Sequence, residues 1–79
     1  MILPNKLISF QDCILAKTIC VLDKIKDTNY SINELYRKVE NQFEDINEYM
    51  LALDVLYVLE KIKYNEELQV IQYVKENNL

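Results

Sequence analysis

The sequence predicts a mainly helical α+β fold in which three helices are followed by a C-terminal β-hairpin. Apolar residues recur at helical spacing within residues 10–26, 32–41 and 46–60. After Lys61 they alternate with polar residues, which is the period of a strand. Three helices with such a hairpin form a winged helix-turn-helix, with the hairpin as its wing. At 79 residues the chain is expected to form a single winged-helix-like domain over residues 1–79.

The first helix is expected to start near Ser9 and Asp12, because these side chains can cap a first turn. The polar stretch 26–29 is expected to end it. The helical period predicts that its core face consists of Leu15, Ile19, Leu22 and Ile25, with Ala16 and Cys20 beside them.

The start of the second helix has the clearest local signal in the chain, the segment YSINEL. Ser31 and Glu34 have the spacing of a capping box, and Tyr30 can staple onto Leu35. The predicted inward residues are Leu35, Tyr36 and Val39, with Phe43 filling the core from the connection that follows.

The third helix is apolar on more than one face. Asp45 followed by Glu48 predicts its start. A helix that is apolar around most of its circumference is buried on most sides, so either the domain wraps it or another protein or a second copy covers it. The residues expected to serve the core are Tyr49, Leu53, Leu56 and Tyr57, and those expected to lie partly elsewhere are Leu51, Val55, Val58 and Leu59.

The predicted hairpin has alternating apolar residues on either side of the polar turn 65–67, from Ile62 to Tyr73. Two strands alone are marginal in water, so the hairpin is expected to pack on the helices. A fourth short helix over 68–75 is the alternative, because Leu68, Ile71 and Val74 also fit a helical period.

Charge and hydropathy disfavour nucleic acid and membranes as partners. The formal charge is −4, and the segment 45–60 carries acidic residues and no basic one, so it would repel a phosphate backbone. No apolar run approaches the roughly 20 residues of a membrane span, and the start MILPNK lacks the layout of a signal peptide. We therefore expect a cytoplasmic protein that has no membrane contact and no direct nucleic-acid contact.

Catalytic signals are absent from the sequence, so we expect no enzyme, no cofactor and no metal. The chain has no His and no Gly-rich phosphate loop. Cys13 and Cys20 lack CxxC spacing and are expected to be reduced packing residues.

Tyr occurs six times, which is a high count for a short chain, and Tyr is enriched in protein interfaces.

Three segments, MILPNK, YSINELY and LALDVLYVLEKIKYN, resemble the middle component of ABC-three-component systems. This resemblance spans nearly the whole chain. Middle components are small winged-helix-like proteins encoded beside an ABC ATPase of the chromosome-maintenance type and a variable third protein, in systems regarded as defence against phage and mobile elements. Relatives often carry glycine in the first helix and just before the first strand, where this chain has Ala16-Lys17 and Glu60.

The resemblance implies a non-catalytic adaptor that links the ATPase to its effector, both encoded in the same locus, with a homodimer as a further possibility. The residues predicted to bind the partner are Ile2, Leu3, Pro4 and Asn5, and Leu51, Asp54, Val55 and Val58. The N-terminal four either cover an edge of their own domain or lie across a partner. Asp54 either pairs with a basic residue of the partner or belongs to a solvated stripe, which is the commoner setting for a lone acidic residue.

The alternative function is a small winged-helix DNA-binding transcriptional regulator. It would use the lysines near the wing, Lys61, Lys63 and Lys75. The two functions differ in salt dependence, because phosphate contacts weaken steeply as salt rises and an apolar interface does not.

Overall fold

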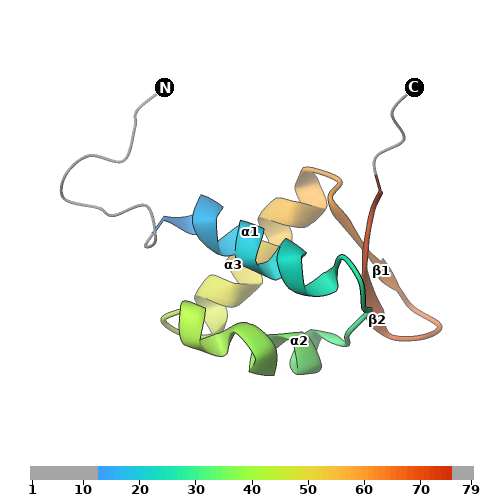
Figure 1. Ribbon diagram of the computed structural model, residues 1–79, viewed down its shortest axis with the longest axis horizontal. Helices are drawn as coiled ribbons and strands as arrows, with labels where there is room; N and C mark the ends of the chain where they lie inside the picture. Colours follow the sequence, from blue (N-terminus) through green and yellow to red (C-terminus); the bar gives the residue numbers. More distant parts are fainter. Residues whose placement is uncertain (1–12, 76–79) are drawn as a thin grey trace.

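The computed structural model describes residues 13–75, and it has a winged-helix-like layout of three helices and a hairpin (Figure 1). The predicted α+β fold, mainly helical, is therefore confirmed. The alternative of a fourth helix over 68–75 is wrong, because this segment holds the second strand. The elements are α1 (Ile14–Ile25), α2 (Ile32–Val39), the short 3-10 helix η2 (Glu40–Gln42), α3 (Ile46–Val58), β1 (Ile62–Asn65) and β2 (Val70–Tyr73).

The capping box at the start of α2 is formed as predicted. Ser31 Oγ accepts a hydrogen bond from the Glu34 amide, and Glu34 Oε1 accepts one from the Ser31 amide, both at 3.1 Å. These two bonds satisfy backbone donors that a helix start leaves unpaired. The α-helix ends at Val39, and η2 carries the chain on to Phe43, which is buried in the core as predicted.

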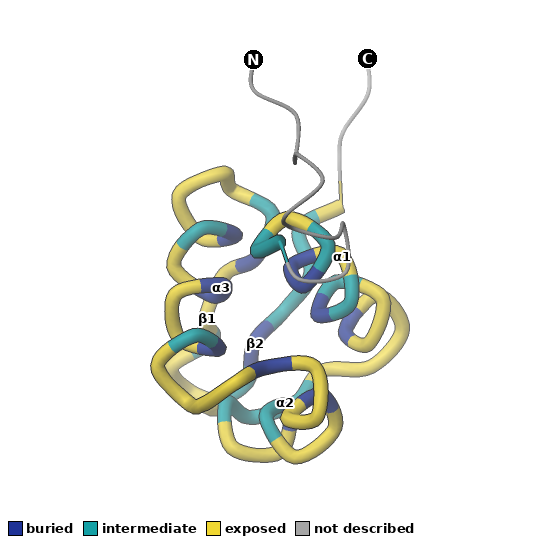
Figure 2. The backbone as a smooth tube through the Cα atoms, turned by 90° about the vertical axis from the view of Figure 1, so that its left-hand side faces the viewer, coloured by how far each residue is buried: buried dark blue, intermediate teal, exposed yellow. Residues whose placement is uncertain are grey.

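Tyr49 of α3 lies at the centre of the core. Its side chain is fully buried, and its hydroxyl donates to the Ile32 carbonyl at the start of α2 at 2.7 Å. Its ring centroid lies 4.8 Å from that of Tyr36 and 5.6 Å from that of Phe43. Burial raises the pKa of the Tyr49 phenol well above its usual range. One side chain thus connects α3, α2 and the segment between them. The buried stretches of α1, α2 and α3 face a common interior (Figure 2).

The core face of α1 differs from the prediction. Leu15 and Ile19, expected inside, are 56% and 54% exposed, whereas Lys17 and Thr18 are buried. The helix is turned so that the Lys17 ammonium reaches Glu48, and the Thr18 hydroxyl donates to the Leu15 carbonyl at 2.7 Å. The helix begins at Ile14, with Cys13 as its N-cap and without a side-chain capping bond. The predicted start at Ser9 and Asp12 falls outside the described residues.

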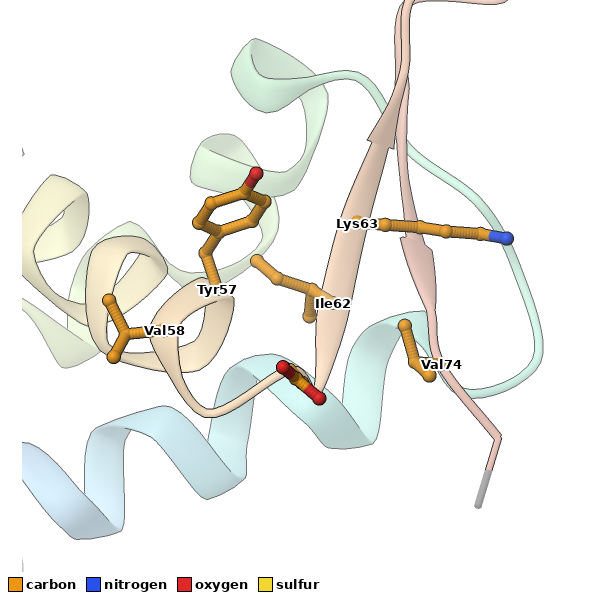
Figure 3. Close-up of a pocket in the computed structure, with 6 residues that line it drawn as sticks. Tyr57, Val58, Ile62, Lys63 and Val74 are labelled. Carbon is orange, nitrogen blue, oxygen red and sulfur yellow. The ribbon is translucent and has the colours of Figure 1, made fainter. Parts of the chain in front are cut away.

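The core face of α3 is predicted correctly with one exception. Tyr49, Leu53 and Leu56 are buried, but Tyr57 is 64% exposed. Next to the last turn of α3 the core is filled by Leu56 of the helix and by Ile62 of β1. Tyr57 therefore lies on the open side, beside the strand (Figure 3). The α-helix ends at Val58, two residues before the predicted end.

An ion pair between residues far apart in the chain joins α1 to the start of α3. Lys17 Nζ lies 2.7 Å from Glu48 Oε1, and the two side chains are 8% and 26% exposed. Asp45 caps α3 as predicted, by accepting from the Glu48 amide at 3.0 Å, while Glu48 accepts from the Glu44 amide at 2.9 Å. The Lys17 hydrogen bond, followed by that of the Glu44 amide, lowers the pKa of the Glu48 carboxyl.

Stability is expected to depend on pH through Glu48. Its folded-state pKa lies below the ordinary value of 4.5. The stabilisation is therefore complete above that value and is lost as the pH falls through the folded-state pKa. The Glu48→Gln variant should lose stability less steeply between about pH 5 and pH 3 than the wild type, measured by urea unfolding. The exposed Glu40→Gln variant serves as the control, and equal pH slopes for all three proteins would contradict this assignment.

The Tyr49→Phe variant is expected to lower the free energy of unfolding by about 1–2 kcal/mol. It keeps the buried ring and removes the hydrogen bond that the Tyr49 hydroxyl donates to the Ile32 carbonyl. Urea unfolding followed by circular dichroism measures the change, with Tyr64→Phe as the control because Tyr64 is exposed. Equal stability of the Tyr49→Phe variant and the wild type would show that the hydroxyl contributes nothing.

Candidate protein interface

Several large apolar side chains of α3 are exposed. Val58 is the most exposed of these apolar side chains, at 76%. Scattered exposed apolar residues are ordinary, but a contiguous group marks an interaction site. The exposed large apolar residues of α3 and its C-cap are Ile46, Met50, Leu51, Tyr57, Val58 and Leu59.

The structure brings the predicted partner-binding residues of α3 together. Asp54, Val55 and Val58 line one shallow depression of about 260 Å³ with Leu59. Leu51 is exposed and lies one turn before Val55, on the same side of the helix. We call these five residues the α3 apolar face. The role of this face in binding a partner stays a prediction, and the other predicted residues, Ile2, Leu3, Pro4 and Asn5, fall outside the described residues.

Asp54 is the single charged residue of the α3 apolar face. It is exposed, and no residue within 13–75 forms an ion pair with it. In the chain by itself, this exposure favours the interpretation of Asp54 as part of a solvated stripe, because its carboxylate keeps its contact with water. The same position leaves it able to pair with a basic group that approaches the face from outside.

A second apolar concavity, missed by the sequence analysis, lies between α3 and β1. We call it the α3–β1 groove; its cavity of about 150 Å³ is lined by Ile32, Met50, Leu53, Asp54, Tyr57, Ile62, Lys63, Tyr64 and Ile71. It continues into an open cleft beside Glu60 and Val74 (Figure 3). The Lys63 side chain runs away from Tyr57 there, so its ammonium group does not face the groove. The residue that could have indicated this groove is Tyr57, which the helical period predicts to lie in the core.

The basic residues near the wing differ in exposure. Lys63 and Lys75 are exposed, and Lys61 is half-buried. The helix that a helix-turn-helix protein places in the major groove corresponds to α3, whose exposed residues are apolar, acidic or, at Asn47, neutral polar, with no basic residue among them.

A turn with a left-handed residue fixes β1 against α3. Glu60 has φ 62°, its amide donates to the Tyr57 carbonyl at 3.0 Å, and the Lys61 amide donates to the Leu56 carbonyl at 2.9 Å. These bonds form a Schellman motif, in which glycine is favoured because a Cβ atom disfavours positive φ. Glu60 is also the position where the resemblance implied glycine in relatives. Its backbone therefore keeps the conformation that glycine would favour.

The Glu60→Gly variant is expected to raise the free energy of unfolding by about 1 kcal/mol, because it removes the cost of a left-handed side-chain-bearing residue. Thermal or urea unfolding measures the gain. Glu60→Ala is the matched control, since it removes the same charge and keeps the Cβ atom. A gain shared equally by both variants would assign the effect to charge and not to backbone conformation.

Neither a metal centre nor a membrane span is found in the described part of the chain. Residues 13–75 contain no cluster of three or more His, Cys, Asp or Glu side chains placed to hold a metal ion. No helix in this range has the length and hydropathy needed to cross a bilayer. Cys13 and Cys20 are free thiols and half-buried.

Comparison with known proteins gives one informative match. No curated protein and no solved structure shows significant similarity to this chain. The family model described as ABC-three component (ABC-3C) system Middle Component 7 matches residues 3–71, a range that runs from the N-terminal segment through all three helices to β2. The match confirms the resemblance found in the sequence, and it covers most of the chain. The protein therefore belongs to the Middle Component 7 family of ABC-three-component systems.

Proposed function

We propose that the chain is a non-catalytic adaptor subunit of a cytoplasmic ABC-three-component system. In this role it links the ABC ATPase to the effector through protein contacts, and the assembly acts in defence against phage and other mobile elements. Membership of the middle-component family supports a role among the other components of such a system. The link to two particular partners is our proposal.

The observation that carries the proposal is the α3 apolar face. A short chain has a small core, so each large apolar side chain left in water forgoes stabilisation of about 1.5–3 kcal/mol that burial would provide. Leu51, Val58 and Leu59 are all more than half exposed. Their side chains gain this energy when a partner covers the face, which gives the adaptor an apolar interface that is insensitive to salt.

The alternative, a small winged-helix DNA-binding regulator, has weaker support. Lys63 and Lys75 are exposed near the wing, but α3 carries acidic residues and no basic one. A reader of the major groove needs basic and polar side chains on the helix that approaches the bases. DNA binding by this chain would therefore depend on the wing alone.

The Val58→Lys variant is expected to weaken binding to the partner at least tenfold, or about 1.4 kcal/mol. A charge at the most exposed apolar position of the face would be desolvated in the complex. The test is co-expression of the tagged chain with the proteins encoded beside it, purification at about 0.5 M salt to screen charge contacts, and light scattering to count subunits.

Ile19→Lys is the matched control for Val58→Lys, because it places the same side chain on an exposed apolar position of α1. Circular dichroism checks that both variants fold. Recovery of the ATPase in a defined ratio by the wild type and the control, with loss in Val58→Lys, is the expected result. Purification of the wild type without any companion would overturn the proposed function, and equal binding by Val58→Lys would show that another surface is used.

A further inference from the structure

The hydrogen bonds of the hairpin show which of its two edges is open. The Ile71 amide donates to the Tyr30 carbonyl at 2.7 Å, so the backbone of Ile71 faces away from β1. Tyr64 is the register partner of Ile71. Facing residues of an antiparallel pair either exchange both their bonds or neither, so the N–H and C=O groups of Tyr64 point away from β2.

The rest of the register agrees with this assignment. The Val74 amide donates to the Lys61 carbonyl at 2.9 Å, which makes 61 and 74 a bonded pair. Bonded and non-bonded pairs alternate, so Lys63 and Asn65 bond to β2, while Ile62 and Tyr64 turn their backbone groups outward. Ile62 is buried, whereas Tyr64 is exposed. Among residues 13–75, Tyr30 covers the edge of β2, and no hydrogen-bond partner covers Tyr64 on the edge of β1.

The open edge of β1 forms one wall of the α3–β1 groove. Met50 and Tyr57 of α3 and Tyr64 of β1 line the cavity, and all three side chains are exposed. A volume of about 150 Å³ is close to that of cavities known to hold a benzene-sized group. A pair of outward backbone groups beside an apolar cavity suits an extended peptide, which can bond to the edge and insert one large side chain.

We propose that an extended segment of a partner protein adds to β1 at Tyr64 as a further strand. It places one large apolar side chain in the α3–β1 groove and a Lys or Arg beside Asp54. This inference rests on the proposed function, because it identifies how the adaptor holds one of its partners. The single bridge between Tyr30 and Ile71 on the opposite edge shows the same kind of contact within the chain.

Charge favours a basic segment of another protein over a second copy of this chain. Asp54 and Lys63 are the charged residues that line the groove, and the Lys63 side chain runs away from Tyr57 (Figure 3). Glu66 and Glu67 follow β1 in the hairpin turn. The chain as a whole has a formal charge of −4. Each copy carries the same net charge, which opposes the pairing of two copies, whereas a strand with Lys or Arg next to its apolar residue would be attracted.

The Tyr64→Pro variant tests the backbone contact. Proline is tolerated on an edge strand where the amide faces outward, and it removes the donor needed for strand addition. Tyr64→Thr is the matched control, because it also lacks the ring but keeps the amide and a strand-forming residue. Binding to the co-purified companion is expected to fall at least tenfold in Tyr64→Pro relative to Tyr64→Thr, with circular dichroism confirming that both are folded. Equal binding by the two variants would overturn the proposal.

Amide exchange measured by NMR on the full wild-type chain provides a second test that does not depend on a variant. In the free protein the Tyr64 amide should exchange much faster than those of Lys63 and Asn65, which bond to β2. In the complex with the companion, the Tyr64 amide should slow at least tenfold.

Each other outcome of the exchange experiment overturns the proposal in a distinct way. Slow exchange of the Tyr64 amide in the free monomer would mean that another part of the same chain covers the edge. Slow exchange that depends on concentration, with a dimer in light scattering, would assign the edge to a second copy. A complex in which the Tyr64 amide still exchanges fast would refute strand addition and leave the adaptor function standing. No complex at all would refute both.

Discussion

The ion pair between Lys17 and Glu48 lies on the same side of α1 as the buried Val21 and Ile25, and together these contacts hold α1 against α3. A lysine on the inner side of α1 is acceptable because its ammonium group has a carboxylate partner at 2.7 Å, and lies 5.8 Å from the centroid of the Phe43 ring. With Lys17 inside, Leu15 and Ile19 lie outside. Glu48 also accepts the Glu44 amide bond next to the start of α3, so the same carboxylate serves both the contact between the helices and the cap region.

The helix α3 carries apolar side chains on more sides than the core covers. One stripe, centred on Tyr49 and Leu56, completes the core. The opposite side carries the α3 apolar face, and the side toward β1 carries the groove beside Tyr57. In a DNA-binding relative of this layout the corresponding helix would be polar and basic on its outer side. The composition of this helix therefore gives a layout associated with reading DNA an apolar and acidic outer surface.

Local signals predicted most of the fold, and the failures share one physical cause. Two kinds of signal act within a few residues of chain and could therefore be recognised in the sequence. They are the capping residues Ser31 and Asp45 and the change of period after Lys61. The rotation of α1 depends on a partner 31 residues away, and the position of Tyr57 depends on where β1 begins. Both are tertiary effects that an apolar period cannot encode. The exposed apolar residues of α3 could be predicted, because a surplus of apolar residues on one helix is visible in the sequence without tertiary information.

The bridge between Tyr30 and Ile71 has a consequence for the order in which the chain folds. It joins the residue before the α2 cap to the last strand, across most of the described sequence. A hairpin by itself is only marginally stable in water, and this contact gives β2 a neighbour on its second edge. During synthesis the bond cannot form until Ile71 has left the ribosome, so β2 reaches Tyr30 only after all three helices have been made. A nascent chain of this kind gains from rapid closure of the hairpin once Ile71 is free.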